Sequence, residues 1–282
     1  DPSSAPISTV DNVTYTLTDN VNDSIVVERD NIVLDGAGYT VQGTGNGTGI
    51  DLSGRSNVTV KNITVTRFYY GIYLSRSGNN TVSDNNANNN GYGIYLAYSN
   101  GNTVSDNTAN NNDWGGIRLH YSGNNTVSGN NAANNIYDGI FLYSSSNNTV
   151  SANNATHNQR DGIYLAYSNG NTVLDNTAKN NWGCGISSSG SSNTVSGNNA
   201  NNNGYYGILL SSSNNNTISG NNANNNAQDG IHLDYSSNNI ISGNNIRANN
   251  RYGILLYEAS NNKFYHNNFI DNTRQVAISV YC

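Results

Sequence analysis

The residues with the clearest chemical potential lie on three successive segments of the chain. Arg118 and His120 are two residues apart, so both side chains point to the same side of an extended strand. Asp138 and Asp161 each stand directly before a glycine in the two segments that follow. An arginine, a histidine and two carboxylates on one face can bind an acidic sugar and move a proton. If the protein is an enzyme, we expect these four residues to be catalytic.

The same positions also support a plainer interpretation. The place before the glycine holds tyrosine, glycine, cysteine or aspartate in other segments, and Asp-Gly is a common turn pair. No segment is lengthened by an insertion, whereas enzymes commonly build their sites from long loops. We therefore favour a protein without catalysis and keep the four residues as the alternative.

A repeat of 22 or 23 residues positions these side chains. Its marker is a Gly-Ile pair, which recurs from Gly49-Ile50 to Gly253-Ile254. The period is too short for a helical repeat and suits a flat coil of three short strands. These strands are expected in the Gly-Ile-Tyr-Leu, Asn-Thr-Val-Ser and Asn-Asn-Ala-Asn segments, with Ser, Gly and Asn at the corners. The sequence predicts an all-β, right-handed parallel β-helix of about ten to twelve coils.

Coils of equal length place like residues above one another. One apolar column begins at Val82 and another at Ala87, with Ile and Leu of the first strand forming two more. Each fully buried Val or Ile contributes roughly 1.5–3 kcal/mol, so the stack is stable only as a whole. Asparagine columns begin at Asn80 and Asn85, where amides about 4.8 Å apart can hydrogen-bond along the stack. We assign these asparagines a structural role.

The regularity of the repeat changes at residue 49. Residues 1–48 form irregular starting coils, with strands expected at Val13–Leu17, Ile25–Val27, Ile32–Leu34 and Tyr39–Val41. Residues 49–282 form the regular repeats of the same continuous domain, and Ala277–Val280 resembles one strand of an unfinished coil. Unpaired strand edges at the ends of such a stack predict self-association.

Composition excludes several classes of partner. The net charge is −6, and the 12 Lys and Arg residues form no basic cluster, so we expect no nucleic-acid binding. No apolar stretch approaches the length of a membrane span. The first residue is not Met, which fits a mature secreted or cell-surface product. Candidate glycosylation sequons start at Asn12, Asn22, Asn46, Asn57, Asn62, Asn79, Asn124, Asn147, Asn154 and Asn215.

Cysteine and metal ligands are scarce. Cys184 and Cys282 are either free thiols or partners in a bridge within or between chains. Asp84 and Asp106 lie one coil apart and form a weak candidate for a calcium site, because two carboxylates are few for calcium. We expect no other cofactor.

Two further patterns run along the outside of the coils. Tyr73, Tyr95, Phe141 and Tyr164 make an aromatic stripe, which we interpret as a binding face for surface glycans or a neighbouring protein. The stripe is flanked by Tyr98, Tyr121 and Tyr167. Thr-x-Ser segments make parallel hydroxyl ladders, which favour solubility or lateral packing.

Several segments resemble one known family. Ile32-Val33-Leu34-Asp35-Gly36 and Gly49-Ile50-Asp51-Leu52 resemble the opening of NosD-like β-helix proteins, and the Gly-Ile-Tyr-Leu and Asn-Asn-Thr-Val segments resemble their later coils. The Asn-rich style resembles surface proteins of methanogenic archaea. The likeness also implies carbohydrate-active relatives. It implies copper-site maturation too, but Met is absent, and the four histidines, at 120, 157, 232 and 266, lie in different coils.

Together these observations favour a structural protein of the cell surface, in an envelope, sheath or fibre, whose partners are further copies of itself and surface glycans. The alternatives are a carbohydrate-active β-helix (lyase, epimerase or hydrolase) and a passive glycan-binding module.

Overall fold

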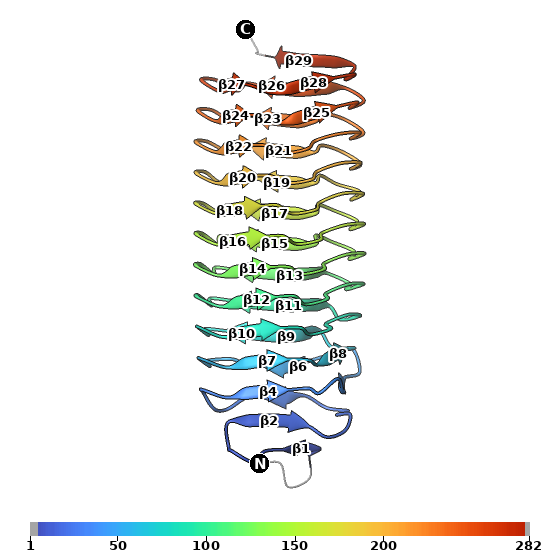
Figure 1. Ribbon diagram of the computed structural model, residues 1–282, viewed down its shortest axis with the longest axis vertical. Helices are drawn as coiled ribbons and strands as arrows, with labels where there is room; N and C mark the ends of the chain where they lie inside the picture. Colours follow the sequence, from blue (N-terminus) through green and yellow to red (C-terminus); the bar gives the residue numbers. More distant parts are fainter. Residues whose placement is uncertain (1–4, 280–282) are drawn as a thin grey trace.

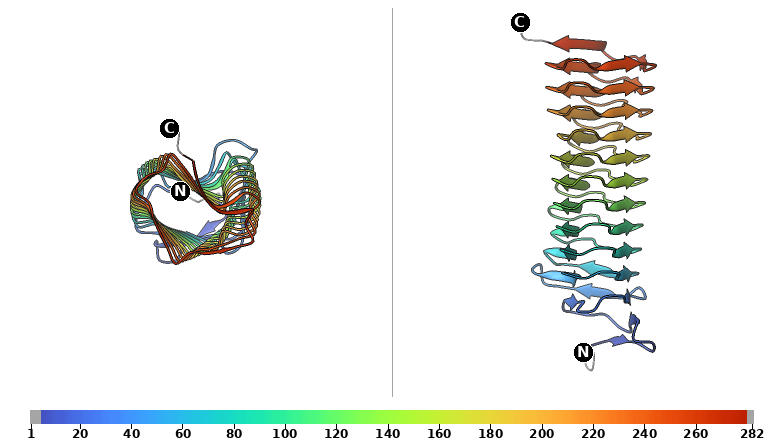
Figure 2. Two further views of the ribbon diagram at one scale, coloured as in Figure 1. Left: turned by 90° about the horizontal axis from the view of Figure 1, so that it is seen from above. Right: turned by 90° about the vertical axis from the view of Figure 1, so that its left-hand side faces the viewer.

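The computed structural model describes residues 5–279 as one column of stacked coils (Figure 1). Seen from above, the coils superimpose around a common axis (Figure 2). Two long sheets run the length of the column, and every pair within them is parallel except β1 with β2. The predicted all-β solenoid is confirmed, since residues 5–279 contain strands, turns and bends but no helix.

The first sheet has 13 strands. They are β1 (Ile7–Ser8), β2 (Thr14–Leu17), β4 (Val33–Asp35), β7 (Thr59–Lys61), β10 (Thr81–Ser83), β12 (Thr103–Ser105), β14 (Thr126–Ser128), β16 (Thr149–Ser151), β18 (Thr172–Leu174), β20 (Thr194–Ser196), β22 (Thr217–Ser219), β24 (Ile240–Ser242) and β27 (Lys263–Tyr265).

The second sheet has 12 strands. They are β3 (Ile25–Val26), β6 (Thr48–Asp51), β9 (Tyr70–Ser75), β11 (Tyr92–Ala97), β13 (Gly115–His120), β15 (Ile140–Tyr143), β17 (Ile163–Ala166), β19 (Ile186–Ser188), β21 (Ile208–Ser211), β23 (Ile231–Asp234), β26 (Tyr252–Tyr257) and β29 (Arg274–Ser279).

The register of both sheets equals the sequence repeat. Val82 pairs with Val104 and Val104 with Val127, and all three side chains are fully buried. The Ile and Leu columns of the second sheet and the alanine column are buried in the same way. The vertical stacking of like residues, on which the predicted core depends, is therefore confirmed.

The third face of each coil is shorter than the sequence suggested. Strands form there only as β5 (Thr40–Gln42) with β8 (Thr64–Thr66) and β25 (Asn245–Arg247) with β28 (Asn268–Ile270). Between these pairs the coils are joined by isolated bridges such as Asn86 to Thr108. In these coils the third face is the short segment between the left-handed corners at Asp84 and Asn89 and their equivalents.

Asparagine ladders line the inside of the corners, as predicted. The Asn130 amide donates to Asn153 Oδ1 at 2.9 Å and to the Val104 carbonyl at 2.9 Å. Its Oδ1 accepts the Asn107 backbone N–H at 3.0 Å. A third ladder, beginning at Asn90 and Asn112, was not expected, although its residues also recur every 22 or 23 positions.

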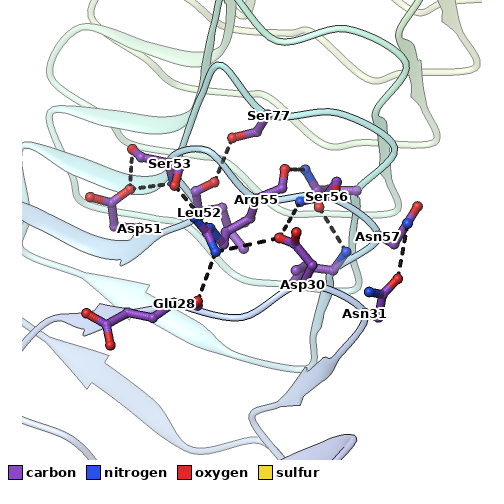
Figure 3. A network of polar contacts seen from close by, with 12 residues as sticks. Glu28, Asp30, Asn31, Asp51, Leu52, Ser53, Arg55, Ser56, Asn57 and Ser77 are labelled. Carbon is purple, nitrogen blue, oxygen red and sulfur yellow. Dashed lines mark hydrogen bonds and ion pairs between the residues drawn. The ribbon is translucent and has the colours of Figure 1, made fainter.

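The starting coils are held by individual polar contacts instead of ladders (Figure 3). Arg55 donates from Nη1 to the Glu28 carbonyl at 2.9 Å and lies 3.7 Å from Asp30 Oδ1. Asp30 Oδ1 also accepts the Ser56 backbone N–H at 3.0 Å. Strands occur close to the four expected places before residue 48, and β1, which was not expected, pairs antiparallel with β2.

Candidate functional site

The outer face of the 12-stranded sheet carries the predicted aromatic stripe. In register along this face lie Tyr73, Tyr95, Arg118, Phe141 and Tyr164. We call this surface the tyrosine face. The stripe is less exposed than the sequence suggested, because neighbouring rings pack over it. Only 9% of Tyr95 is exposed, and burial raises its pKa to about 12.

A small pocket opens at one edge of the tyrosine face. It has a volume of about 180 Å³, roughly that of six water molecules in the liquid. We call it the Arg118 pocket. It is lined by Tyr92, Trp114, Gly115, Ile117, Arg118, Tyr137, Asp138, Phe141 and Arg160.

The pocket exists because one coil lacks a side chain. Gly115 occupies the column that holds Tyr70 and Tyr92 in the coils before it and Asp138 in the coil after it. The missing ring leaves a gap between Tyr92 and Asp138. No cleft-forming loop is needed.

Arg118 is enclosed by aromatic rings. Its guanidinium carbon lies 5.5 Å from the Tyr92 centroid, 5.5 Å from that of Tyr95 and 4.9 Å from that of Phe141. Cations are attracted to the faces of such rings. Nη1 donates to the Tyr92 hydroxyl at 3.0 Å, whereas the buried Nε has no hydrogen-bond partner. The side chain is thus held in place with donor capacity left over.

Asp138 and Asp161 are brought together on successive coils. The Asp161 backbone N–H donates to Asp138 Oδ1 at 3.1 Å, and the Cys184 backbone N–H donates to Asp161 Oδ1 at 2.7 Å. Burial, helped by the charge of Asp161, raises the pKa of Asp138 to about 6. Burial also raises the pKa of Asp161, although the Ser187 hydroxyl and the Cys184 N–H oppose the rise.

His120 does not join this cluster. It lies at the other end of β13, where its Nδ1 is 3.2 Å from the Tyr95 hydroxyl and its ring contacts Tyr121 and Tyr143. Burial and then the nearby Arg118 lower its pKa. The structure therefore unites Arg118, Asp138 and Asp161, while His120 belongs to a separate aromatic group.

A row of exposed tyrosines follows the opposite edge of the tyrosine face. Tyr98, Tyr121, Tyr167 and Tyr235 have φ angles of 52°, 50°, 51° and 46°. We call them the corner tyrosines. Between 44% and 66% of each side chain is exposed. Left-handed backbone is unfavourable for a bulky residue, and such strain is often found at functional positions.

A buried group formed by one carboxylate, one imidazole and one phenol ring was not predicted from the sequence. Asp229 is fully buried, and its Oδ2 lies 2.7 Å from His232 Nδ1. The Tyr206 ring packs on His232 at 4.4 Å between centroids. The useful signal was the position before glycine, which Asp229 shares with Asp138 and Asp161.

The other predicted sites lie on the surface or stand apart. Asp84 and Asp106 are exposed corner residues with left-handed backbone, and residues 5–279 contain no group of three or more His, Cys, Asp or Glu arranged to hold a metal. Cys184 is a buried free thiol, and Cys282 lies outside the described residues. All the sequon asparagines are exposed except Asn154, which is half-buried.

Two family models match the chain, each over about half of its length. Residues 48–200 match the right-handed β-helix region model, and residues 138–280 match the model described as periplasmic copper-binding protein (NosD). The chain belongs to the NosD-like right-handed β-helix proteins. No curated protein matches the sequence significantly.

Solved structures share the fold of this NosD-like chain at low sequence identity. The A-module of the Azotobacter vinelandii mannuronan C-5 epimerase AlgE6 is 16% identical with a TM-score of 0.77, and the match covers 94% of this chain and 87% of the module. The Dettilon tailspike protein is 16% identical with a TM-score of 0.75, covering 94% of this chain and 61% of that chain. The periplasmic alginate epimerase AlgG, as a point mutant, is 14% identical with a TM-score of 0.65, covering 97% and 80%.

The donor set of this NosD-like chain does not fit copper. The sequence has no Met, and burial raises the pKa of the Cys184 thiol well above its usual range, which disfavours the metal-binding thiolate. The imidazole–carboxylate pair of His232 and Asp229 offers only two possible ligands.

No helical segment within residues 5–279 could span a lipid bilayer.

Proposed function

We propose that this β-helix is a non-enzymatic scaffold of the cell surface that binds polysaccharide along its tyrosine face. The corner tyrosines are the observation that carries the proposal. Many other left-handed corners hold asparagine, such as Asn124 and Asn147, which adopts this backbone readily, and the corner-tyrosine column itself holds Ser144, Ser212 and Glu258 in other coils. A tyrosine in such a place is exposed and strained, so its ring is better explained by contact with a ligand than by folding.

Stacked aromatic rings line both edges of the tyrosine face. Tyr98 and Tyr121 stack with centroids 5.2 Å apart and planes 11° from parallel. Across the sheet, Trp114 and Tyr137 stack at 5.2 Å along the other edge. Rigid aromatic surfaces bind the apolar faces of sugar rings at low entropic cost. The fold is shared with alginate epimerases and a glucanase catalytic domain, which supports a carbohydrate ligand by analogy only.

Affinity electrophoresis in the presence of a panel of neutral and acidic polysaccharides tests the proposal. The test variant carries Tyr98→Asn and Tyr121→Asn, which remove two rings and relieve backbone strain. Ser144→Asn is the matched control, since Ser144 occupies the same corner one coil later with φ 46°. We expect the double variant to remain folded and to lose at least about tenfold in affinity, equivalent to about 1.4 kcal/mol. Equal binding by wild type and double variant, or no binding to any polysaccharide, would overturn the proposal.

One observation favours turnover as the second candidate. Asp138 has a pKa of about 6 and lines the Arg118 pocket, so it holds a proton under mildly acidic conditions as a general acid must. Incubating acidic and neutral polysaccharides with wild type and with Asp138→Asn separates the candidates. Release of new reducing or unsaturated ends by wild type alone would establish catalysis.

A further inference from the structure

Asp138 differs from its counterparts in how its second oxygen is used. In the three aspartates that precede the repeat glycine, Asp138, Asp161 and Asp229, Oδ1 accepts a backbone N–H of the next coil, which is given by Asp161, Cys184 and Tyr252 respectively. Oδ2 of Asp161 also accepts the Ser187 hydroxyl at 2.6 Å, and Oδ2 of Asp229 is bonded to His232. Among the described residues, Oδ2 of Asp138 has no such partner. The repeat position that holds His232 beside Asp229 holds Phe141 beside Asp138, and the position that holds Ser187 beside Asp161 holds Tyr164. Neither Phe141 nor Tyr164 forms a hydrogen bond to Asp138 Oδ2.

The two guanidinium groups of the Arg118 pocket form no ion pair among residues 5–279, although both lie close enough to Asp138 to lower its pKa. The ion pairs within residues 5–279 are Arg55–Asp30, Lys61–Asp35, His232–Asp229 and Arg247–Asp271. Neither Arg118 nor Arg160 belongs to one. Arg160 lies over the Tyr137 ring at 5.6 Å, and Arg118 lies among three rings. Aromatic faces hold both cations in place without neutralising them.

We propose that the Arg118 pocket binds the carboxylate of an acidic sugar unit, with Arg118 and Arg160 as donors and Asp138 Oδ2 as the adjoining hydrogen-bond partner. This inference rests on the proposed polysaccharide-binding function and names its substrate class. Guanidinium groups are well suited to carboxylates because they present several donors in a plane. Gly115 provides the space that the carboxylate enters.

The charges around Asp138 give this binding a pH dependence. Arg118 faces Asp138 from β13, Arg160 and Asp161 face it from the next coil, and Tyr164 and Cys184 also sense its charge. When Asp138 is protonated, it donates to the ligand carboxylate. When it is ionised, it repels the ligand, so acidic sugars bind more weakly as the pH rises from 5 to 7.5. The loss is about tenfold for each unit by which the ligand raises the pKa of Asp138.

Calorimetric titration of the full chain with trigalacturonic acid, trimannuronic acid and their methyl esters tests the inference. We expect at least one acid to bind about tenfold more tightly than its ester at pH 5. Arg118→Gln and Arg160→Gln should remove that preference. Gly115→Tyr, which restores the ring found in the two preceding coils, should also remove it while leaving both arginines in place. Arg251→Gln is the matched control, because Arg251 holds the same repeat position as Arg160 and lies over the Tyr252 ring.

Equal binding of acids and esters, with polysaccharide still bound at the corner tyrosines, would overturn this inference and leave the proposed function intact. A preference for acids that survives in both arginine variants would also overturn it. Absence of binding to oligomers and polymers alike would overturn both. Circular dichroism of each variant shows that a loss is not unfolding, and the exposed Arg160 gives a substitution that leaves the core untouched.

Discussion

The backbone N–H of Asp161 donates to Asp138 Oδ1 at 3.1 Å, which ties the buried carboxyl group of Asp138 to the backbone of the next coil. Asp138 is only 4% exposed, so its charged form loses most of its hydration. This relationship links the stability of the coils to pH and provides the first prediction.

Asp138→Asn should make the protein less sensitive to pH. Burial raises the pKa of Asp138 from 3.8 to about 6, so the folded state binds this proton more tightly than the unfolded state. The resulting stabilisation is complete below about pH 3.8 and is lost as the pH rises through about 6. Relative to Asp138→Asn, wild type should lose roughly 2 kcal/mol of unfolding free energy between pH 4 and pH 7. Denaturant titrations at both pH values measure this, and parallel pH profiles would contradict it.

The asparagine ladders predict that alanine substitution lowers the free energy of unfolding strongly at one residue and hardly at all at its neighbour. Asn221 is fully buried, its amide donates to the Val195 carbonyl and to Asn244, and its Oδ1 accepts from Asn198. Asn222 is exposed. Asn221→Ala leaves several buried groups unpaired and should cost on the order of 3 kcal/mol or more. Asn222→Ala should stay within about 0.5 kcal/mol, and similar losses for both variants in denaturant titrations would argue against the ladder.

The Ser187 hydroxyl should matter more than other outward hydroxyls. It donates to Asp161 Oδ2 at 2.6 Å and is only 3% exposed. Ser187→Ala leaves a buried carboxylate oxygen without this donor and should cost roughly 1–3 kcal/mol at pH 7. Ser219→Ala, in the hydroxyl ladder of the 13-stranded sheet, is the control and should be nearly neutral. A neutral Ser187→Ala would mean that water replaces the hydroxyl.

Much of the fold could be predicted because the repeat is almost free of exceptions. Once coil length is known, the pairing of Val104 with Val127 and of Asn107 with Asn130 follows directly. The third strand was overestimated because a recurring polar segment does not show whether its pairing extends beyond isolated bridges, such as Asn86 to Thr108. Asn90 was not predicted to be a ladder residue, although it recurs at the same repeat spacing as Asn80 and Asn85.

The site could be predicted only in part. Repeat position correctly placed Asp138 beside Asp161, and strand alternation placed Arg118 on the outer face. His120 was grouped with them because it points to the same side, yet two residues along a strand are separated by about 7 Å. The rings of Tyr92 and Phe141 around Arg118, and the gap left by Gly115, depend on side-chain packing that the repeat alone does not specify.

A crystal structure of the chain with a bound acidic oligosaccharide would show whether the tyrosine face binds sugar. We predict sugar density on the tyrosine face, against Tyr98 or Tyr121, with a carboxylate in the Arg118 pocket. Density on the hydroxyl ladders of the 13-stranded sheet, or an empty tyrosine face in crystals at ligand concentrations that saturate the protein in solution, would contradict it.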